Sequence, residues 1–336
     1  MGQYWKIRNI DYEETTGDLG KLGEFFWYGD DDVISLLITP VIPPHFKSKP
    51  VLSKTSVSEV KDDSTISPPT LLTLPVELLV VIAEELMDDY LNLICFSLTC
   101  VSMWELTHPV RYRVLESELR YKSWAGCRII LLGDYAQNLP KGILTAEEIG
   151  QLTMKNEDDK DSDEDEEDLD KKMDKTLGRR LYKADFRRVS LHLNISVLED
   201  RRLWGRSSLY KELSKFDRRF RPWLSFDWNR FLPREAEGDS WMVRNFSKRE
   251  FVAMSSSHHL AQVVFSLIGC SDDPSISMID GDWLIEGPWA GNRIDITLAS
   301  LHEQEHRDET DWKDITAEVK QRLEALAIAE SRNFEF

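Results

Sequence analysis

Two histidines stand four residues apart in the segment HEQEH at 302–306, with Glu303 directly after the first. On a helix this spacing places both imidazoles on one face, where they can hold zinc while the glutamate activates a metal-bound water for peptide hydrolysis. The surroundings argue against that chemistry, because charged residues follow and Glu305 would lie on a surface that such sites keep dry. No third ligand accompanies the pair. We therefore predict no metal and no cofactor, and interpret the segment as a solvated stretch between a strand and a helix.

Tryptophan and arginine recur in a second pattern, WAGCRI at 124–129 and WAGNRI at 289–294. Both residue types are enriched at recognition sites, so Trp124, Arg128, Trp289 and Arg293 could line a ligand cleft. They could also be structural anchors, with each tryptophan in a core and each arginine paired with a local carboxylate or carbonyl. We favour the anchor interpretation. No Walker loop, GxGxxG or GxSxG motif occurs, and we predict that the chain is not an enzyme.

The repeated block belongs to a longer internal repeat. WKIRNIDYEE at 5–14 matches WMVRNFSKRE at 241–250, and DFRRVS at 185–190 matches DWKDIT at 311–316. The three blocks come in the same order in both halves, which indicates a duplicated module. The first copy contains two long additions, and surface loops tolerate such insertions at low thermodynamic cost. Because an apolar stretch after 190 replaces the helical pattern that follows 316, the third block could differ in structure between the copies.

The module reads as a mixture of strands and helices. Alternating residues at 293–298 and an apolar run at 127–132 predict two strands, and Gly126 and Gly291 are expected to adopt positive φ where the chain enters them. Thr316 is expected to cap a helix whose apolar positions recur at helical spacing.

A helix is also predicted over 74–87, with Thr73 as its cap and Pro75 where a missing N–H costs little. Its only polar residues before position 87 are three glutamates, so most of its circumference is apolar. Such a helix needs more than one packing surface. One surface is expected to pack on the apolar stretch 91–98, and the other needs either the rest of the chain or a partner.

The spacing around this helix resembles the F-box, a three-helix segment that docks onto the linker subunit of SCF-type ubiquitin ligases. The resemblance rests on LPxELxxxIxxxL from Leu74 and continues to Trp104, which follows Cys100 by one residue more than is usual in the family. The layout as a whole, with MGQYW at the start and two WAGxRI blocks, is similar to a group of fungal F-box-like proteins. The resemblance implies that the linker subunit is gripped by Leu74, Pro75, Leu78, Ile82, Leu86 and Leu91. The alternative is an ordinary helical hairpin buried within the chain.

The predicted fold class is α+β, a duplicated strand and helix module with an inserted F-box-like three-helix segment and a disordered acidic loop. The first copy is divided among 1–44, 119–152 and 177–198, and the second copy occupies 240–330. Between them we place a linker at 45–70, the F-box-like segment at 71–118, the acidic loop at 153–176 and a basic-aromatic connector at 199–239.

Charge and composition narrow the possible partners of this 336-residue chain. The net charge is −18, of which −10 falls within 157–170, so nucleic acid is not an expected partner. The four cysteines form no CxxC pair, and no apolar run reaches the ~20 residues of a membrane helix. We expect a cytoplasmic or nuclear adaptor that brings an unknown protein target to the ligase. The alternatives are a non-ligase binding or scaffold protein and, least favoured, a zinc metallopeptidase acting through HEQEH.

Overall fold

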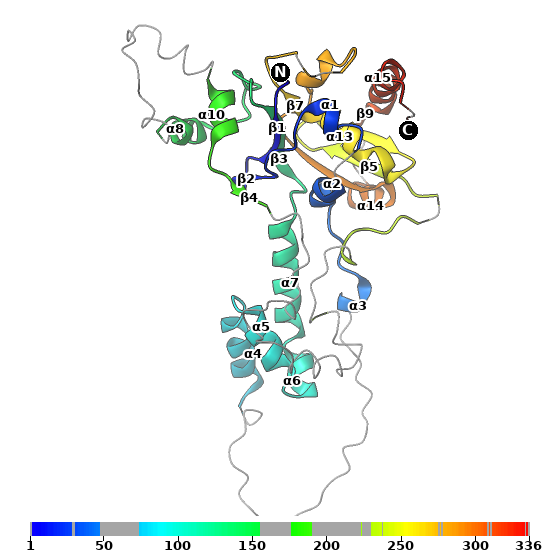
Figure 1. Cartoon of the computed structure of the whole chain (residues 1–336). Coiled ribbons are helices and arrows are strands. Elements are labelled where there is room, and N and C mark those ends of the chain that lie inside the picture. Colours follow the sequence, from blue (N-terminus) through cyan, green and yellow to red (C-terminus); the bar gives the residue numbers. More distant parts are fainter. Residues whose placement is uncertain are drawn as a thin grey trace, which may run out of the picture. The chain divides into compact units, whose positions relative to one another are not determined.

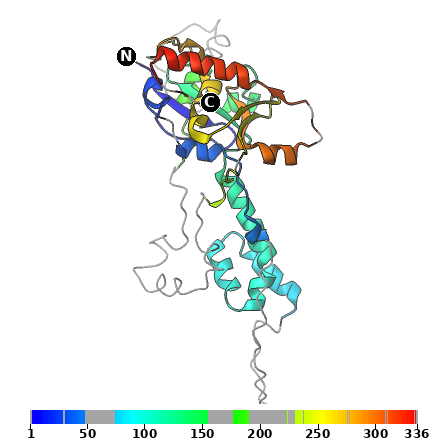
Figure 2. The same cartoon turned by 90° about the vertical axis from the view of Figure 1, so that its right-hand side faces the viewer.

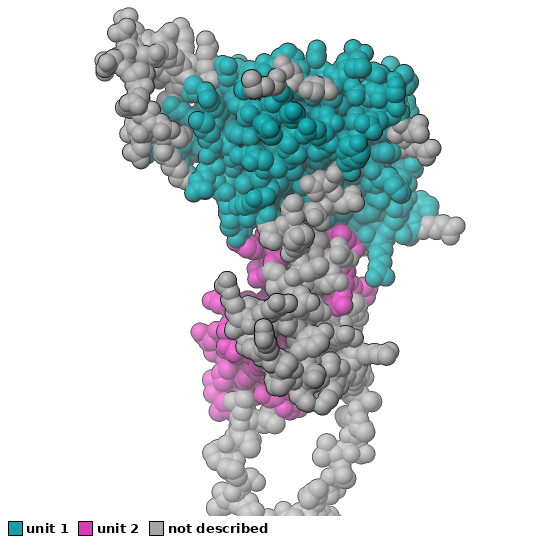
Figure 3. Space-filling model, in the orientation of Figure 1, with its two compact units in different colours: residues 1–39, 123–192, 233–336 teal, residues 40–122, 193–232 magenta. Residues whose placement is uncertain are grey.

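The computed structural model forms two compact units, which Figure 3 shows in different colours. Unit 1 comprises residues 1–39, 123–192 and 233–336, and unit 2 comprises 40–122 and 193–232. The residues that the structure describes are 2–28, 31–47, 74–154, 176–189, 223, 230–236, 238–274, 276, 278–307, 309, 311–332 and 334. Most of the predicted linker 45–70, acidic loop 153–176 and connector 199–239 lies outside the described residues.

Unit 1 is built on one mixed sheet of nine strands (Figure 1). Eight strands follow the order β4-β2-β1-β3-β8-β5-β6-β9, and β7 pairs with β3 beside this path. Their bounds are β1 Trp5–Asn9, β2 Glu14–Thr15, β3 Cys127–Gly133, β4 Arg187–Arg188, β5 Trp241–Asn245, β6 Glu250–Met254, β7 Gly269–Cys270, β8 Asn292–Leu298 and β9 Lys313–Asp314.

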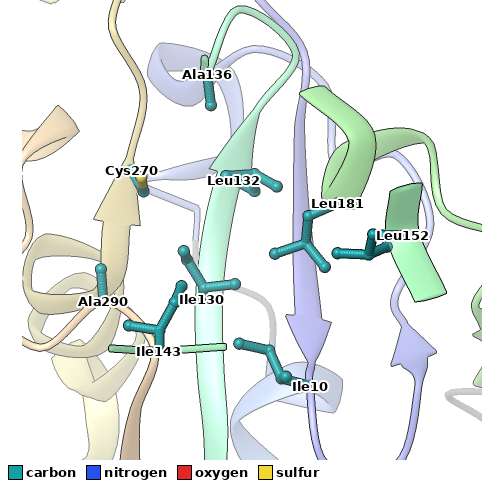
Figure 4. Close-up of a cluster of buried hydrophobic side chains, with 9 residues drawn as sticks. All are labelled: Ile10, Ile130, Leu132, Ala136, Ile143, Leu152, Leu181, Cys270 and Ala290. Atoms are coloured by element: carbon teal, nitrogen blue, oxygen red, sulfur yellow. The ribbon is translucent and has the colours of Figure 1, made fainter. Parts of the chain in front are cut away.

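Helices pack on this sheet. Every residue of α13 is buried, and this helix contacts β3, β5 and α15, which Figure 2 shows in red. Over β3, side chains from α8 and α10 meet Ile130 and Leu132 in one apolar cluster (Figure 4). The helices of unit 1 are α1 Leu22–Phe25, α2 Asp31–Leu37, α8 Ala146–Met154, α10 Leu177–Lys183, α13 Leu260–Ile268, α14 Ala299–Glu305 and α15 Thr316–Ala329, with short 3-10 helices η5 Ser257–His259 and η6 Asp282–Ile285.

The sheet repeats itself about its centre. Read inward from either edge, the order is β4-β2-β1-β3 on one side and β9-β6-β5-β8 on the other, with the same parallel and antiparallel pairings. The two central strands pair antiparallel, and Arg128 lies directly opposite Arg293. The internal repeat therefore corresponds to two structural copies related by approximate two-fold symmetry. Its third block keeps its strand in both copies, as β4 and β9, while the stretch after 190 lies outside the described residues.

Each copy lends a segment to the other. Gly269 in β7 of the second copy pairs with Leu131 of the first, and Ile38 of the first copy forms a bridge with Ile296 of the second. Both pairings are parallel, and each follows a helix, α13 in one copy and α2 in the other. Each copy therefore supplies a short neighbouring segment to the other, in addition to the direct pairing of β3 with β8 that joins them.

Matched hydrogen bonds support the same symmetry. The amide of Gly126 donates to Ile294 O at 2.8 Å, and the amide of Gly291 donates to Ile129 O at 2.8 Å. Both glycines have positive φ, 78° and 73°, as the sequence predicted.

The predicted strands at 127–132 and 293–298 are confirmed as β3 and β8. The helix after residue 315 is also confirmed, but the prediction that Thr316 caps it was wrong. Ile315 occupies the cap position, and the Thr316 hydroxyl accepts a bond from the amide of Ala253 at 2.9 Å. Thr316 therefore attaches the helix to β6.

Unit 2 contains a group of helices that lie side by side in Figures 1 and 2. The helix predicted over 74–87 is shorter, because it ends at Glu85, and the last helix continues through Lys122. Their bounds are α3 Pro44–Lys47, α4 Val76–Glu85, α5 Tyr90–Ser97, α6 Val101–Leu106 and α7 His108–Lys122.

The predicted α+β class is confirmed, since helices accompany a mixed sheet. Among the described residues, no helix combines the length and apolar character needed to cross a membrane.

Candidate functional site

The α4 helix has one buried side and one open side. Leu79 and Ala83, four residues apart on one face, are 4% and 0% exposed, and Ala83 packs with Leu93, Val110 and Val114 from α5 and α7. Apolar side chains that are exposed to solvent stand just before α4 and on its first turns. Their exposed fractions are 37% for Leu74, 56% for Val76, 49% for Leu78 and 49% for Val81. We call these four residues and Pro75 the α4 surface.

The six predicted partner-binding residues differ in how exposed their side chains are. Leu74, Pro75 and Leu78 are exposed, so they are accessible to a second protein. Ile82 is half-buried, and Leu86 is half-buried against the core shared with α5 and α7. The side chain of Leu91 lies outside the described residues.

A second core holds the helices below this surface. The guanidinium of Arg111 in α7 is 0% exposed and lies over the rings of Trp104, at 3.2 Å from the ring centre, and Trp223, at 4.6 Å. It donates to Trp104 O at 2.6 Å. Burial lowers the pKa of Arg111 to about 9, with Tyr90 acting in the opposite direction. Sequence reasoning missed this core, because Trp223 is distant in the chain and a single arginine in a charged helix gives no signal.

The recurring tryptophans are buried anchors. Trp124 and Trp289 are both 0% exposed. The Trp124 indole N–H donates to the Glu14 carboxylate at 2.6 Å, and that of Trp289 donates to Glu250 at 2.7 Å. Neither indole lines an open cleft, so the geometry fits the anchor interpretation.

The recurring arginines meet at the centre of the sheet. Arg128 bonds to Asp11 at 2.7 Å and also pairs with Glu148. Arg293 donates to the same Asp11 at 2.7 Å and to Gly126 O at 3.0 Å. The bonds to Glu148 and Asp11 outweigh burial and raise the pKa of Arg128. The Asp11 carboxylate therefore bridges Arg128 and Arg293, so the charges of both arginines are paired within unit 1.

A buried arginine on β1 and its counterpart on β5 were not predicted as site residues. Arg8 and Arg244 are each 2% exposed. Arg244 makes two bonds to Asp295, at 2.8 and 2.6 Å, whereas Arg8 faces Ile130 at the matching position of β3. The guanidinium of Arg8 instead donates to main-chain carbonyls, including that of Ala184 at 3.1 Å. The two arginines occupy the same position of the first repeated block, and this coincidence was a sequence signal for a matched pair of buried arginines.

The HEQEH segment begins within α14, next to the second of these arginines. His302 Nδ1 lies 3.2 Å from Arg244 Nη1, which also bonds to Glu305 at 3.0 Å. His306 Nδ1 lies 3.2 Å from Glu309, and the two imidazole ring centres are 5.0 Å apart. A guanidinium beside one imidazole opposes a bound cation. The histidines are also half-buried rather than fully solvated, which corrects the prediction of a simple solvated stretch.

Within the described residues, no group of three or more His, Cys, Asp or Glu side chains is arranged to hold a metal ion. The α4 surface is the candidate site that the described residues support best. Comparisons with protein-family models, with curated proteins and with solved structures found no match to this chain.

Proposed function

We propose that this chain is a substrate receptor of an SCF-type ubiquitin ligase, with the α4 surface docking onto the linker subunit. The supporting observation is that four large apolar side chains at the start of α4 are between 37% and 56% exposed, while Leu79 and Ala83 of the same helix are buried. Large exposed apolar patches mark interaction sites in proteins, and here several exposed apolar side chains stand close together in the sequence at the start of one helix. In this proposal the duplicated module of unit 1 recruits a protein target, in the cytoplasm or the nucleus.

The mechanism in this proposal is proximity, and no side chain of the chain performs a chemical step. Supporting it, the arginines and tryptophans that recur in the module are engaged in internal bonds. The runner-up is a non-ligase scaffold, in which the hairpin is only a structural insertion. That alternative requires the α4 side chains to be covered by the chain itself, and the exposure of Leu74 and Leu78 does not favour it.

The test is co-purification with the linker subunit. Leu78→Asp combined with Ile82→Asp places one charge on the α4 surface and one at the half-buried position 82, both among the predicted linker-binding residues, and we expect it to abolish capture. The matched control is Ile279→Asp with Ile328→Asp, because these unit 1 side chains are 60% and 78% exposed and lie outside the α4 surface. The control is expected to bind like the wild type.

Hydrogen exchange in α7 shows whether the double variant keeps unit 2 folded. Absence of linker capture by the wild-type chain, or unchanged capture by a folded double variant, would reject the ligase proposal in favour of the scaffold.

A further inference from the structure

Unit 1 contains a hollow of about 560 Å³ where three segments meet: the loop after β3, the helix α10 and the loop after β7. This volume lies in the range of roughly 300–1,000 Å³ that is common for small-molecule sites. The lining residues used below are Asp134, Tyr135, Arg179, Tyr182, Lys183 and Asp272.

The walls of the hollow are fixed by polar bonds. The Asp272 carboxylate accepts the amides of Gln137, at 2.5 Å, and Asn138, at 2.9 Å, as well as the Asn138 side chain at 2.6 Å. On the other side, the amide of Gly178 donates to Gln137 O at 2.9 Å. A Cβ at Gly178 would lie only 2.8 Å from the backbone of Ala136, so glycine permits this close approach of α10. The hollow is therefore organised before any ligand arrives.

The positive charges of the hollow are uncommitted, unlike its carboxylates. Arg179 and Lys183 lie one turn apart on α10, both are exposed, and neither forms an ion pair with a described residue. Asp272 already accepts three bonds, and Asp134 accepts the amide of Tyr4 at 3.1 Å. The third lining carboxylate, Asp273, also has an interaction of its own. The donors to Asp272 and Asp134 are neutral amides, so these carboxylates keep their charge, and an anion would have to bind through Arg179 and Lys183 on the α10 side of the hollow.

The second copy provides an internal comparison. A hollow of about 590 Å³ lies beside α14, after the central strand β8, as the first lies after β3. Glu309 lines it two residues before Asp311, and Lys183 lines the first hollow two residues before the matched Asp185. Glu309 is also engaged, since it lies 3.2 Å from His306 and accepts the Trp312 indole N–H at 3.2 Å. The aligned position therefore carries a cation in the first hollow and a carboxylate in the second.

We propose that the hollow between α10 and the loops after β3 and β7 binds a small organic anion, whose carboxylate or phosphate group pairs with Arg179 and Lys183. Charge-assisted bonds from arginine and lysine are the strong contacts for such groups. Tyr135 and Tyr182 line the same hollow and offer ring surface to the rest of the ligand. The proposal is independent of the α4 surface.

The test is calorimetric titration of the full chain with two probes, inorganic phosphate and citrate, which separate the two sources of negative charge. We expect one-to-one binding of at least one probe. Arg179→Gln combined with Lys183→Gln should weaken it at least about tenfold, because both charge-assisted bonds are lost. The matched control, Lys141→Gln with Arg234→Gln, removes the same charge from exposed residues outside the hollow and should leave affinity unchanged.

The proposal is overturned if neither probe binds the wild-type chain, or if the α10 variant binds as tightly as the wild type. It is also overturned if the control variant loses as much affinity, since net charge alone would then explain the effect.

Discussion

Each repeat contains a buried arginine, but Arg244 bonds to the buried carboxylate of Asp295, whereas Arg8 faces Ile130. This difference predicts that Arg244 and Asp295 are energetically coupled. Arg244 is 2% exposed and Asp295 is 4% exposed, and both oxygens of the carboxylate bond to the guanidinium. Burial alone would lower the pKa of Arg244, but the bonds to Asp295 and Glu305 raise it, so the group stays charged. Removing one member of a buried pair typically costs about 3–5 kcal/mol, because the other charge is left without compensation.

We therefore expect Asp295→Asn to lower the free energy of unfolding of unit 1 by about 3 kcal/mol or more. The double variant Arg244→Met with Asp295→Ile should recover most of that loss, because it removes both charges and installs the residue type that Ile130 already supplies in the first repeat. Glu305 serves as the control. It is 48% exposed and bonds to the same guanidinium, so Glu305→Gln should cost less than about 1 kcal/mol.

The assay is native-state hydrogen exchange of the β5 and β8 amides, because unit 2 would contribute to any signal from the whole chain. A loss of 3 kcal/mol corresponds to roughly a hundredfold faster exchange for amides that exchange by global unfolding. The reasoning fails if Asp295→Asn costs under about 1 kcal/mol, or if the double variant is as unstable as the single one.

The remaining predictions concern the second repeat and the turns that precede the central strands. Burial, the Arg244 charge and His306 lower the pKa of His302 below its usual 6.5, so the unfolded chain binds a proton more readily than the folded one. The free energy of unfolding of unit 1 should therefore fall as the pH drops below about 6.5, and denaturation of His302→Gln across this range should show a weaker pH dependence. Gly126→Ala and Gly291→Ala both strain a positive φ, but only at Gly291 would the new Cβ meet a side chain, at 2.6 Å. Thermal melts should therefore show the larger loss for Gly291→Ala, and equal losses would contradict this account. Trp289→Phe leaves the partly exposed Glu250 carboxylate without its indole donor and should cost about 1–3 kcal/mol. A loss under about 0.5 kcal/mol in urea titration would show that the bond is dispensable.

Local pattern and internal repetition predicted much of unit 1. The alternating residues before Leu298 and the apolar run after Gly126 became the two central strands, because burial on one or both faces leaves a distinct period in the sequence. The third repeated block contains the edge strands β4 and β9, but the sequence did not predict strands there, because two residues are too short to leave a pattern.

Long-range pairing could not be predicted in the same way. Nothing in the periodicity around Ile38 or Gly269 indicates that each adds to the sheet of the other repeat. The core of unit 2 depends on Trp223, which is more than a hundred residues from its partner Trp104. Thr316 has the composition of a cap, yet its hydroxyl is used by β6. In each case a contact between distant segments decided the outcome, and single-sequence patterns contain no information about such contacts.

The exchange of segments across the sheet means that each half of the chain supplies a lateral neighbour to the other. Leu131 receives its lateral neighbour from the second half, and Ile296 receives its neighbour from the first. A solitary half would expose these edges and would need another polypeptide to complete it. Because both halves belong to one chain, they associate within one molecule and not as two separate molecules. The effective concentration of one half for the other is set by the connecting segment. A single chain also has one helical unit for its two repeats, whereas a symmetric pair of identical chains would have two.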